Sequence, residues 1–361
     1  MKVAVIGASG FVGLRLVEHL HLTGRAEVVP VVHAYRSLAV LARFGLPWRV
    51  TNPSDPEALG EALKGCDCVV HAALGDAGQI VTMAEALYPA AAKAGVKRIV
   101  ALSSAAVHSL TPAPGTDETT AVLANQKSDY NAAKVKAELL LDAARSRGTV
   151  ELVQLRPSII HGPRSRLVAD IAGQLLDGTA YLVEEGHGIC NAVGVDNLIQ
   201  AIWLALTKPE ADKNTFLVND RETVTWREFY AAIAGAVGTD LSGVHYVKAP
   251  VFRTSPSEKL ARIAATKSVM ATLPLVPARV KRLAKAAAAA WSPPGAPAGW
   301  SLPDAARPRI VEEMCQLQSC HWRYPTAKAE QLLGFSPPVP FLEGMHRTSA
   351  WLQFVGLTRR G

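Results

Sequence analysis

The chain has 361 residues, of which 49% are hydrophobic and 19% are charged, and its formal net charge is +7. This length and composition exclude global disorder and predict a large buried core, in one large domain or two smaller ones. Because the basic residues are spread along the sequence, an anionic cofactor and substrate account for the positive charge, and we expect no nucleic-acid partner.

Hydropathy and cysteine usage indicate the compartment. No apolar run reaches the length that crosses a bilayer, and the apolar start of the chain breaks at once into glycines, unlike a signal peptide. The five cysteines are interpreted as reduced thiols, because their number is odd and no secretory signal precedes them. Cys315 and Cys320 lie beside His321, but no second ligand pair at zinc-like spacing accompanies them, so we expect no metal site. We therefore expect a cytoplasmic protein without a transmembrane segment.

Short apolar runs alternate with helical patterns through the first half of the chain. The apolar runs predict strands at 2–7, 27–32, 66–73, 98–104 and 150–157. The helical patterns fall at 12–24, 55–65, 79–94 and 127–147. Apolar strands separated by helices predict a parallel sheet with helices on both faces, which is the doubly wound, Rossmann-type α/β fold.

The rhythm changes beyond Pro157. An amphipathic helix with its lead-in is expected at 193–206, a strand at 215–220, and a helix at 225–238 with Thr225 as its N-cap. We expect a dinucleotide-binding domain over 1–165 that 190–220 rejoins. A smaller, mostly C-terminal substrate-binding domain is expected to comprise 166–189 and 221–361.

An insertion rich in Pro, Ala, Lys and Arg spans 249–310 within the second domain. It holds two helix-like pieces, around 257–272 and 277–291. The second piece is amphipathic at its start, which suits an exposed helix of a lid or cap, or alternatively a helix that lies on a membrane surface or a partner.

The stretch GASGFVG places Gly7, Gly10 and Gly13 between the first strand and the first helix. Gly7 permits a tight turn, Gly10 lets a pyrophosphate approach the backbone, and Gly13 permits close packing of the helix. The helix N-terminus adds N–H donors and partial positive charge. The loop therefore predicts a dinucleotide site, which also includes Ser9, Phe11 and Val12.

The end of the second strand bears on the choice of cofactor. An acidic residue expected there would bind the adenosine ribose, but the sequence offers His33 and Arg36 instead. An acid would repel a 2′-phosphate, whereas Arg36 can pair with one. The sequence thus favours NADP over NAD, unless Arg36 is only a solvated loop cation.

DYNAAK, at 129–134, places Tyr130 four positions before Lys134. Residues at this spacing share one face of a helix, so the ammonium can lie near the phenol and lower its pKa from about 10. The pair suits proton transfer, although the spacing alone also fits an ordinary polar helix face.

The motifs GASGFVG, RIVALSSAAVH and YNAAK, in this order, resemble the extended short-chain dehydrogenase/reductase superfamily, specifically its NAD-dependent epimerase/dehydratase branch. The likeness continues through RPSIIHGP (156–163), VGVDNLIQAI (193–202) and a tail at 324–352, and leaves out roughly 249–310. It implies that Tyr130 is the general acid/base, that Lys134 lowers its pKa and holds the nicotinamide ribose, and that Ser104, rather than Ser103, binds the substrate oxygen. It also implies a homodimer formed through helices such as 79–94 and 127–147.

Further positions follow from the same resemblance. It implies cofactor contacts near adenine and nicotinamide from Asn52, Pro53, Ala72, Ala73 and Pro157. It implies substrate contacts from His108, His161, Arg164 and Asn191. Either histidine is alternatively a packed, hydrogen-bonded residue.

Three functions are compatible with these motifs. The first is a nucleotide-sugar epimerase or reductase, whose diphosphate Arg164, Arg166 or basic residues in 249–310 can meet. The second is an NADP-dependent ketone/alcohol oxidoreductase on a hydrophobic substrate, like 3β-hydroxysteroid dehydrogenases or dihydroflavonol reductases. The third is a non-catalytic dinucleotide sensor. Nucleotide-sugar 4,6-dehydratases carry Asp-Glu where this chain has Ala105 and Ala106, so we expect no dehydratase activity.

Overall fold

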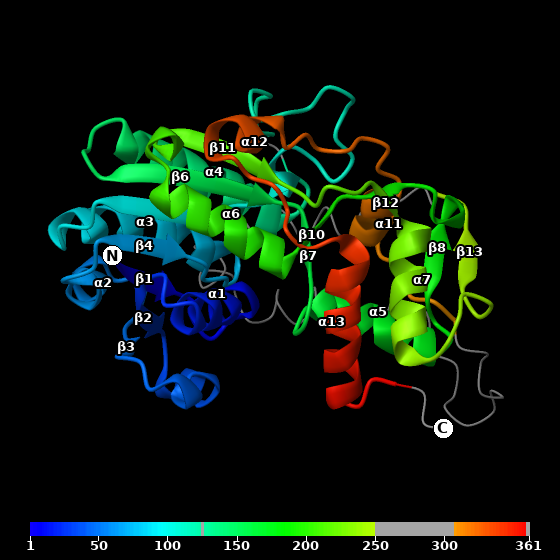
Figure 1. Ribbon diagram of the computed structural model, residues 1–361. Helices are drawn as coiled ribbons and strands as arrows, with labels where there is room; N and C mark the ends of the chain where they lie inside the picture. Colours follow the sequence, from blue (N-terminus) through cyan, green and yellow to red (C-terminus); the bar gives the residue numbers. More distant parts are fainter. Residues whose placement is uncertain (124–125, 250–306, 359–361) are drawn as a thin grey trace, which may run out of the picture. The chain divides into compact units, whose positions relative to one another are not determined.

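A seven-stranded parallel sheet is the centre of the computed structural model, which describes residues 1–123, 126–249 and 307–358. The strand order is β11-β6-β5-β4-β1-β2-β3 (Figure 1). The strands are β1 (Lys2–Ile6), β2 (Glu27–Val32), β3 (Arg49–Val50), β4 (Cys68–His71), β5 (Arg98–Leu102), β6 (Glu151–Pro157) and β11 (Asn214–Val218). The predicted doubly wound parallel sheet is confirmed.

Helices cover both faces of this sheet. The side chains of β1 alternate between the two layers, with Val3 and Val5 in one core and Ala4 and Ile6 in the other. The first core is completed by α1 (Phe11–Leu22), α6 (Val195–Thr207) and α12 (Ala327–Leu333). The second core is completed by α2 (Pro56–Leu63), α3 (Ala77–Lys93) and α4 (Asp129–Arg145). Burial on both faces explains why the strands appear as continuous apolar runs.

Most predicted elements of the first half lie within two or three residues of the observed ones, and β2 has the predicted bounds. The strand β3 and the 3-10 helices η1 (Tyr35–Val40) and η2 (Ala42–Phe44) were not predicted. β3 has only two residues, Arg49 and Val50, both half-buried, so it shows no apolar run.

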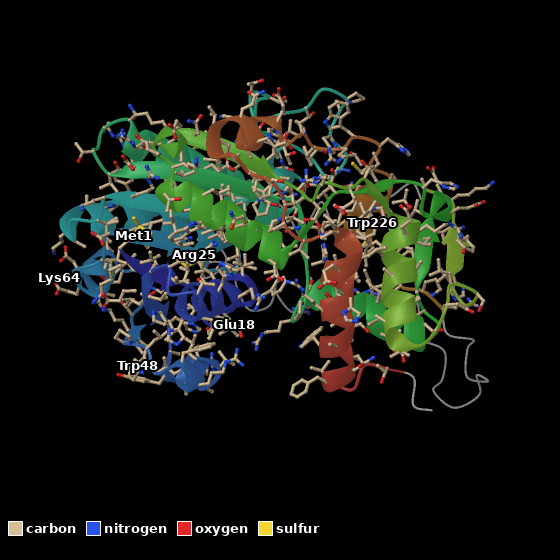
Figure 2. The ribbon with its side chains drawn as sticks, viewed as in Figure 1. Met1, Glu18, Arg25, Trp48, Lys64 and Trp226 are labelled. Atoms are coloured by element: carbon tan, nitrogen blue, oxygen red, sulfur yellow. The ribbon has the colours of Figure 1, made fainter. Side chains whose placement is uncertain are left out.

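A further hydrophobic core lies around α5 (Arg166–Leu176), α7 (Trp226–Val237) and α13 (Phe341–Phe354). Trp226, labelled in Figure 2, and Phe229 are fully buried in it. Two-stranded sheets border this part: β7 (Ile159–His161) with β10 (Ala192–Gly194), β8 (Tyr181–Val183) with β13 (His245–Val247), and β9 (Ile189–Cys190) with β12 (Val224–Thr225). The remaining short helices are η3 (Ala105–Val107), η4 (Glu184–Gly186), η5 (Pro209–Ala211) and α11 (Glu312–Gln318).

The start of α7 confirms the predicted N-cap. The hydroxyl of Thr225 accepts a hydrogen bond from the Glu228 backbone N–H at 3.2 Å, and the Glu228 carboxylate accepts one from the Thr225 N–H at 2.7 Å. This reciprocal pair satisfies two N–H groups that the helix leaves without partners.

By their internal contacts, Met1–Lys248 and Pro308–Gly361 form one compact unit. The predicted division of this unit into a cofactor part and a substrate part stays a prediction. Most of the predicted insertion at 249–310, with its two helical pieces, lies outside the described residues. Among the described helices, none is long and apolar enough to span a membrane.

Candidate active site

A cavity of about 530 Å³ lies at the carboxyl ends of β1 to β4. In an open parallel sheet, ligands bind at this edge where the strand order reverses, here between β1 and β4. Most of the residues predicted to hold the dinucleotide line the cavity: Gly7, Ser9, Gly10, Phe11, Val12, Asn52, Pro53, Ala72 and Ala73. The cavity has the size and the position of a cofactor site.

The glycine turn at the start of this cavity admits no side chain. Gly7 has a φ of +83°, and a Cβ there would lie 2.6 Å from the Ala73 backbone nitrogen. A Cβ on Gly13 would lie 2.2 Å from the Gly7 carbonyl oxygen. Gly10 caps α1 without a side-chain hydrogen bond, so the first N–H groups of the helix stay available for an anion. This geometry fits a dinucleotide pyrophosphate.

The residues after β2 differ in their relation to the cavity. His33 lines it, whereas Arg36 is exposed on η1 and is not part of the lining. Within the described residues, Arg36 has no ion-pair partner. The described lining of this cavity contains no carboxylate.

A second cavity, of about 180 Å³, lies beside the ends of β5 and β6. Of the residues predicted to be catalytic or to contact substrate, Ser104, Tyr130 and Asn191 line it. Ser103 lines a different cavity, beneath Lys134. The other lining residues are Ala105, Ala106, Ser109, Leu110, Asn131, Ser158, Ile159, Ile189, Glu313, Leu317, Cys320 and Tyr324.

Tyr130 stands in the first turn of α4, next to Ser104. Burial raises the pKa of Tyr130, and the negative charge of Glu313 raises it further. A hydrogen bond with the Ser104 side chain lowers the pKa and so opposes these two effects. The helix-face spacing predicted that Lys134 lowers the pKa of Tyr130, but in the structure burial prevails and the pKa is raised. Deprotonated Tyr130 is thus disfavoured, which suits a proton donor.

Lys134 is almost fully buried. Its Nζ donates a hydrogen bond to the Leu102 carbonyl at 2.8 Å and lies 5.9 Å from the centroid of the Tyr130 ring. Burial lowers the pKa of Lys134 to about 8, and the carboxylate of Glu138 opposes this shift. The ammonium faces the phenol, but its own charge is destabilised by the surroundings.

Glu138 belongs to a buried network with Arg156 and His108. Arg156 donates to both Glu138 carboxylate oxygens, at 3.0 and 2.7 Å, and its Nη1 lies 2.9 Å from His108 Nε2. Because a guanidinium only donates, His108 Nε2 accepts, and the ring is neutral. Burial and Arg156 lower the pKa of His108 to about 4.

The other predicted residues lie outside the two cavity linings. His161 is 1% exposed, its Nε2 lies 2.9 Å from Asp220 Oδ2, and it packs against Phe229 and Phe341. His108 and His161 thus match the packed alternative of the sequence analysis. Arg164 is exposed, and neither it nor Pro157 lines either cavity.

Most residues of the second cavity were not predicted, among them the polar residues Asn131, Ser158, Glu313 and Tyr324. Asn131 and Ser158 are side chains with buried polar atoms that lack a hydrogen-bond partner among the described residues. Tyr324 donates to the carbonyls of Ala105 and Ser109, and Glu313 enters from α11. Asn131 and Ser158 lie inside the quoted motifs, but no local pattern links Glu313 or Tyr324 to Tyr130.

The strand order, the glycine turn and the two cavities at one sheet edge define a dinucleotide-binding enzyme of the Rossmann type. The chain belongs to the NAD dependent epimerase/dehydratase family, whose sequence profile matches residues 3–219.

Curated relatives in this family act on different substrates. The chain is 28% identical over 257 residues to 2′-dehydrokanamycin reductase of Streptomyces kanamyceticus, covering 68% of this chain and 69% of that one. It is 24% identical over 266 residues to a decarboxylating sterol-4-alpha-carboxylate 3-dehydrogenase of Dictyostelium discoideum, covering 68% and 79%. It is 26% identical over 264 residues to UDP-glucose 4-epimerase of Vibrio cholerae, covering 65% and 76%.

Solved structures share the fold at low identity. UDP-glucose 4-epimerase of Thermotoga maritima, solved with UDP-glucose, gives a TM-score of 0.67 at 18% identity and covers 98% of this chain and 99% of that one. The dTDP-glucose 4,6-dehydratase of Streptomyces venezuelae, solved with NAD, gives 0.70 at 20% identity and covers 99% of both chains.

Proposed function

We propose that the protein interconverts a ketone and a secondary alcohol on a small neutral or cationic substrate, with NADP(H) as cofactor. The charge of the Tyr130 cavity carries this proposal. Among the described residues that line it, Glu313 is the one ionised side chain, and no Lys or Arg is present. A diphosphate beside this exposed carboxylate, with no cation in the described lining, would be repelled.

The residues at this cavity have complementary roles in the proposed reaction. The bound nicotinamide supplies the hydride chemistry. Tyr130 exchanges a proton with the substrate oxygen, and Ser104 donates a hydrogen bond to the same oxygen. Lys134 keeps a positive charge behind the phenol, which stabilises the phenolate left after proton donation.

Arg36 supports NADP over NAD. It lies four residues beyond β2, exposed and without an ion-pair partner in the described chain, and no acidic residue follows the strand. A 2′-phosphate can form charge-assisted hydrogen bonds with this guanidinium.

A nucleotide-sugar epimerase or reductase, which the sequence analysis placed first, is the second candidate. UDP-glucose 4-epimerases among the relatives and the solved structures support it. It requires cations for the diphosphate from outside the described lining, since Arg164 and Arg166 are exposed away from it. A 4,6-dehydratase is disfavoured, because Ala105 and Ala106 line the cavity and carry no acid or base.

The assembly and the compartment are also proposals. The proposed homodimer, packed through α3 and α4, rests on the family resemblance. All five cysteines are unpaired and buried, which supports a reducing compartment such as the cytoplasm.

A substrate panel tests the proposed function. The protein is assayed with NADPH or NADH against neutral ketones, ketones that carry an amine, and nucleotide-diphosphate hexoses. We expect net cofactor oxidation with a neutral or amine-bearing ketone, and a preference for NADPH. Epimerisation of a nucleotide sugar without net cofactor turnover would establish the second candidate, and cofactor binding with no turnover of any compound would support a sensor.

A further inference from the structure

A small cavity of about 20 Å³ lies beneath Lys134, between the sheet and helices α3 and α4. Its polar lining comes from His71 on β4, Ser103 after β5, Gln154 on β6, and Lys134 and Glu138 on α4. The remaining lining residues are apolar: Ala73, Ile80, Ala84, Leu87, Ala101, Leu102, Ala137 and Leu141. A space of about this size holds one water molecule, provided that two to four polar groups surround it.

Within the described part of the chain, three polar atoms of this lining have no hydrogen-bond partner: His71 Nε2, Ser103 Oγ and Gln154 Oε1. The residues are 9%, 9% and 2% exposed, so bulk water does not reach these atoms. Buried polar atoms without partners are rare in folded proteins, because each loses its hydration without compensation. Three of them around one cavity indicate a shared partner.

The donors and acceptors around the cavity match one water molecule. Gln154 Oε1 is an acceptor, and its amide nitrogen is already bonded to Asp142 Oδ1 at 2.8 Å. His71 is held neutral by burial, which lowers its pKa to about 4, while a hydrogen bond with its own backbone opposes this shift. A neutral imidazole has one accepting nitrogen, and the partnerless Nε2 can fill this role. Ser103 offers its O–H, and Lys134 has N–H groups beyond the one given to Leu102.

We propose that one water molecule occupies this cavity, donates to His71 Nε2 and Gln154 Oε1, and accepts from Ser103 Oγ and Lys134 Nζ. The water ties the Lys134 ammonium to three strands of the sheet. His71, Ser103 and Gln154 are then positioning residues that act on Tyr130 through Lys134. The water site is independent of the proposed reaction, and only its effect on catalysis rests on the proposed function.

The charged and titratable groups that face Lys134 are few. Tyr130 and Glu138 lie on the same helix, His71 faces it from β4, and Arg156 on β6 is paired with Glu138. The water accepts a hydrogen bond from the ammonium and thereby favours the charged form of Lys134. Loss of the water therefore lowers the pH at which Lys134 releases its proton.

A crystal structure of the wild-type enzyme with its cofactor, at a resolution that shows ordered water, is the first test. We expect one density peak at hydrogen-bond distance from His71 Nε2, Ser103 Oγ and Gln154 Oε1. An empty cavity, or direct hydrogen bonds among these three side chains, would overturn the proposal. This readout does not depend on activity, so it separates the water site from the proposed function.

A pair of variants tests the positioning role. Gln154→Met keeps the side-chain length but removes the acceptor, and Asp142→Ala breaks the same Gln154–Asp142 hydrogen bond from the exposed side without altering the cavity lining. With the preferred ketone, we expect Gln154→Met to shift the alkaline limb of the pH profile of kcat/KM to lower pH by about one unit. A shift of this size is typical when a charged group loses one hydrogen-bond partner. Asp142→Ala is expected to leave the limb in place. An unmoved limb in both variants would show that the water does not hold Lys134.

Discussion

Tyr130 and Lys134 occupy one face of α4, with the Lys134 ammonium 5.9 Å from the centroid of the Tyr130 ring. The phenol lines the Ser104 cavity, while the ammonium lies behind it on the side of the sheet core. In the proposed reaction Tyr130 therefore exchanges a proton with the substrate oxygen, and Lys134 supports it from outside the lining of the Ser104 cavity.

Replacing Tyr130 by Phe removes the proposed proton donor and keeps the ring. We expect kcat to fall about 10²- to 10⁴-fold, the usual contribution of a positioned acid or base, with cofactor affinity nearly unchanged. Tyr246→Phe on β13, which is 49% exposed, is the matched control and should retain full activity. Steady-state kinetics and a cofactor fluorescence titration measure both quantities, and full activity in Tyr130→Phe would remove this residue from the mechanism.

The buried Lys134 gives stability a predictable dependence on pH. Its pKa in the folded protein is about 8, against 10.5 for an ordinary lysine. Between these values the unfolded chain binds the proton and the folded protein does not, so this group makes stability rise with pH. Lys134→Met cannot take up this proton, so its stability lacks this rise with pH. We therefore expect the difference in melting temperature, variant minus wild type, to become more negative from pH 8 to pH 10. Parallel curves for the two proteins would contradict the lowered pKa.

Alanine variants of two glycines with positive φ distinguish the cost of backbone strain from an effect on cofactor binding. Gly7 and Gly24 have φ of +83° and +63°, but a Cβ on Gly7 would strike Ala73, whereas a Cβ on Gly24 meets open space. Gly24→Ala should cost about 1–2 kcal/mol of unfolding free energy and leave cofactor affinity unchanged. Gly7→Ala should destabilise more and weaken cofactor binding at least tenfold, because the turn must move. Calorimetry and denaturant unfolding check both, and equal cofactor affinities would show that the turn does not hold the cofactor.

Arg36 should distinguish the two nicotinamide cofactors. Arg36→Ala removes a guanidinium that can bond the 2′-phosphate, and we expect the Kd for NADPH to rise about tenfold to a hundredfold, while the Kd for NADH stays unchanged. Arg43→Ala is the control, because Arg43 is exposed in the same region but is paired with Glu18 at 3.2 Å. Equal losses for both cofactors would remove the basis for NADP selectivity.

Glu313 should set the pH range of Tyr130. The carboxylate raises the pKa of this phenol, so Glu313→Gln lowers it. The pH profile with a neutral ketone should therefore shift toward lower pH. Glu312→Gln is the matched control, because Glu312 accepts a hydrogen bond from Lys127 at 3.1 Å and does not line the cavity. A shift in the control but not in Glu313→Gln would contradict the placement of Glu313.

The sheet and the cofactor cavity could be predicted from the sequence because the patterns that indicate them are local. Strand periodicity, the GASGFVG turn and the small residues after β4 are each continuous in sequence, and most of these residues line one cavity. The parallel topology then brings the strand ends together without further information.

The Tyr130 cavity was harder to predict because its lining comes from segments that are far apart in the sequence. Glu313 and Tyr324 follow Tyr130 by more than 180 residues, and no sequence pattern predicts that the three residues line the same cavity. His161 looked like a substrate residue from its motif, yet Asp220 and two phenylalanines enclose it. The pKa of Tyr130 also depends on burial, which a helix-face argument between two residues does not include.

The fate of the cofactor hydrogen tests the central claim most directly. NADPH labelled with deuterium at C4 is incubated with the preferred ketone and either wild type or Tyr130→Phe, and the alcohol product is analysed by mass spectrometry. We expect one deuterium on the carbinol carbon with wild type, formed at least about a hundredfold faster than with the variant. Equal rates for both proteins, or conversion of a nucleotide sugar with all deuterium left on the cofactor, would contradict it.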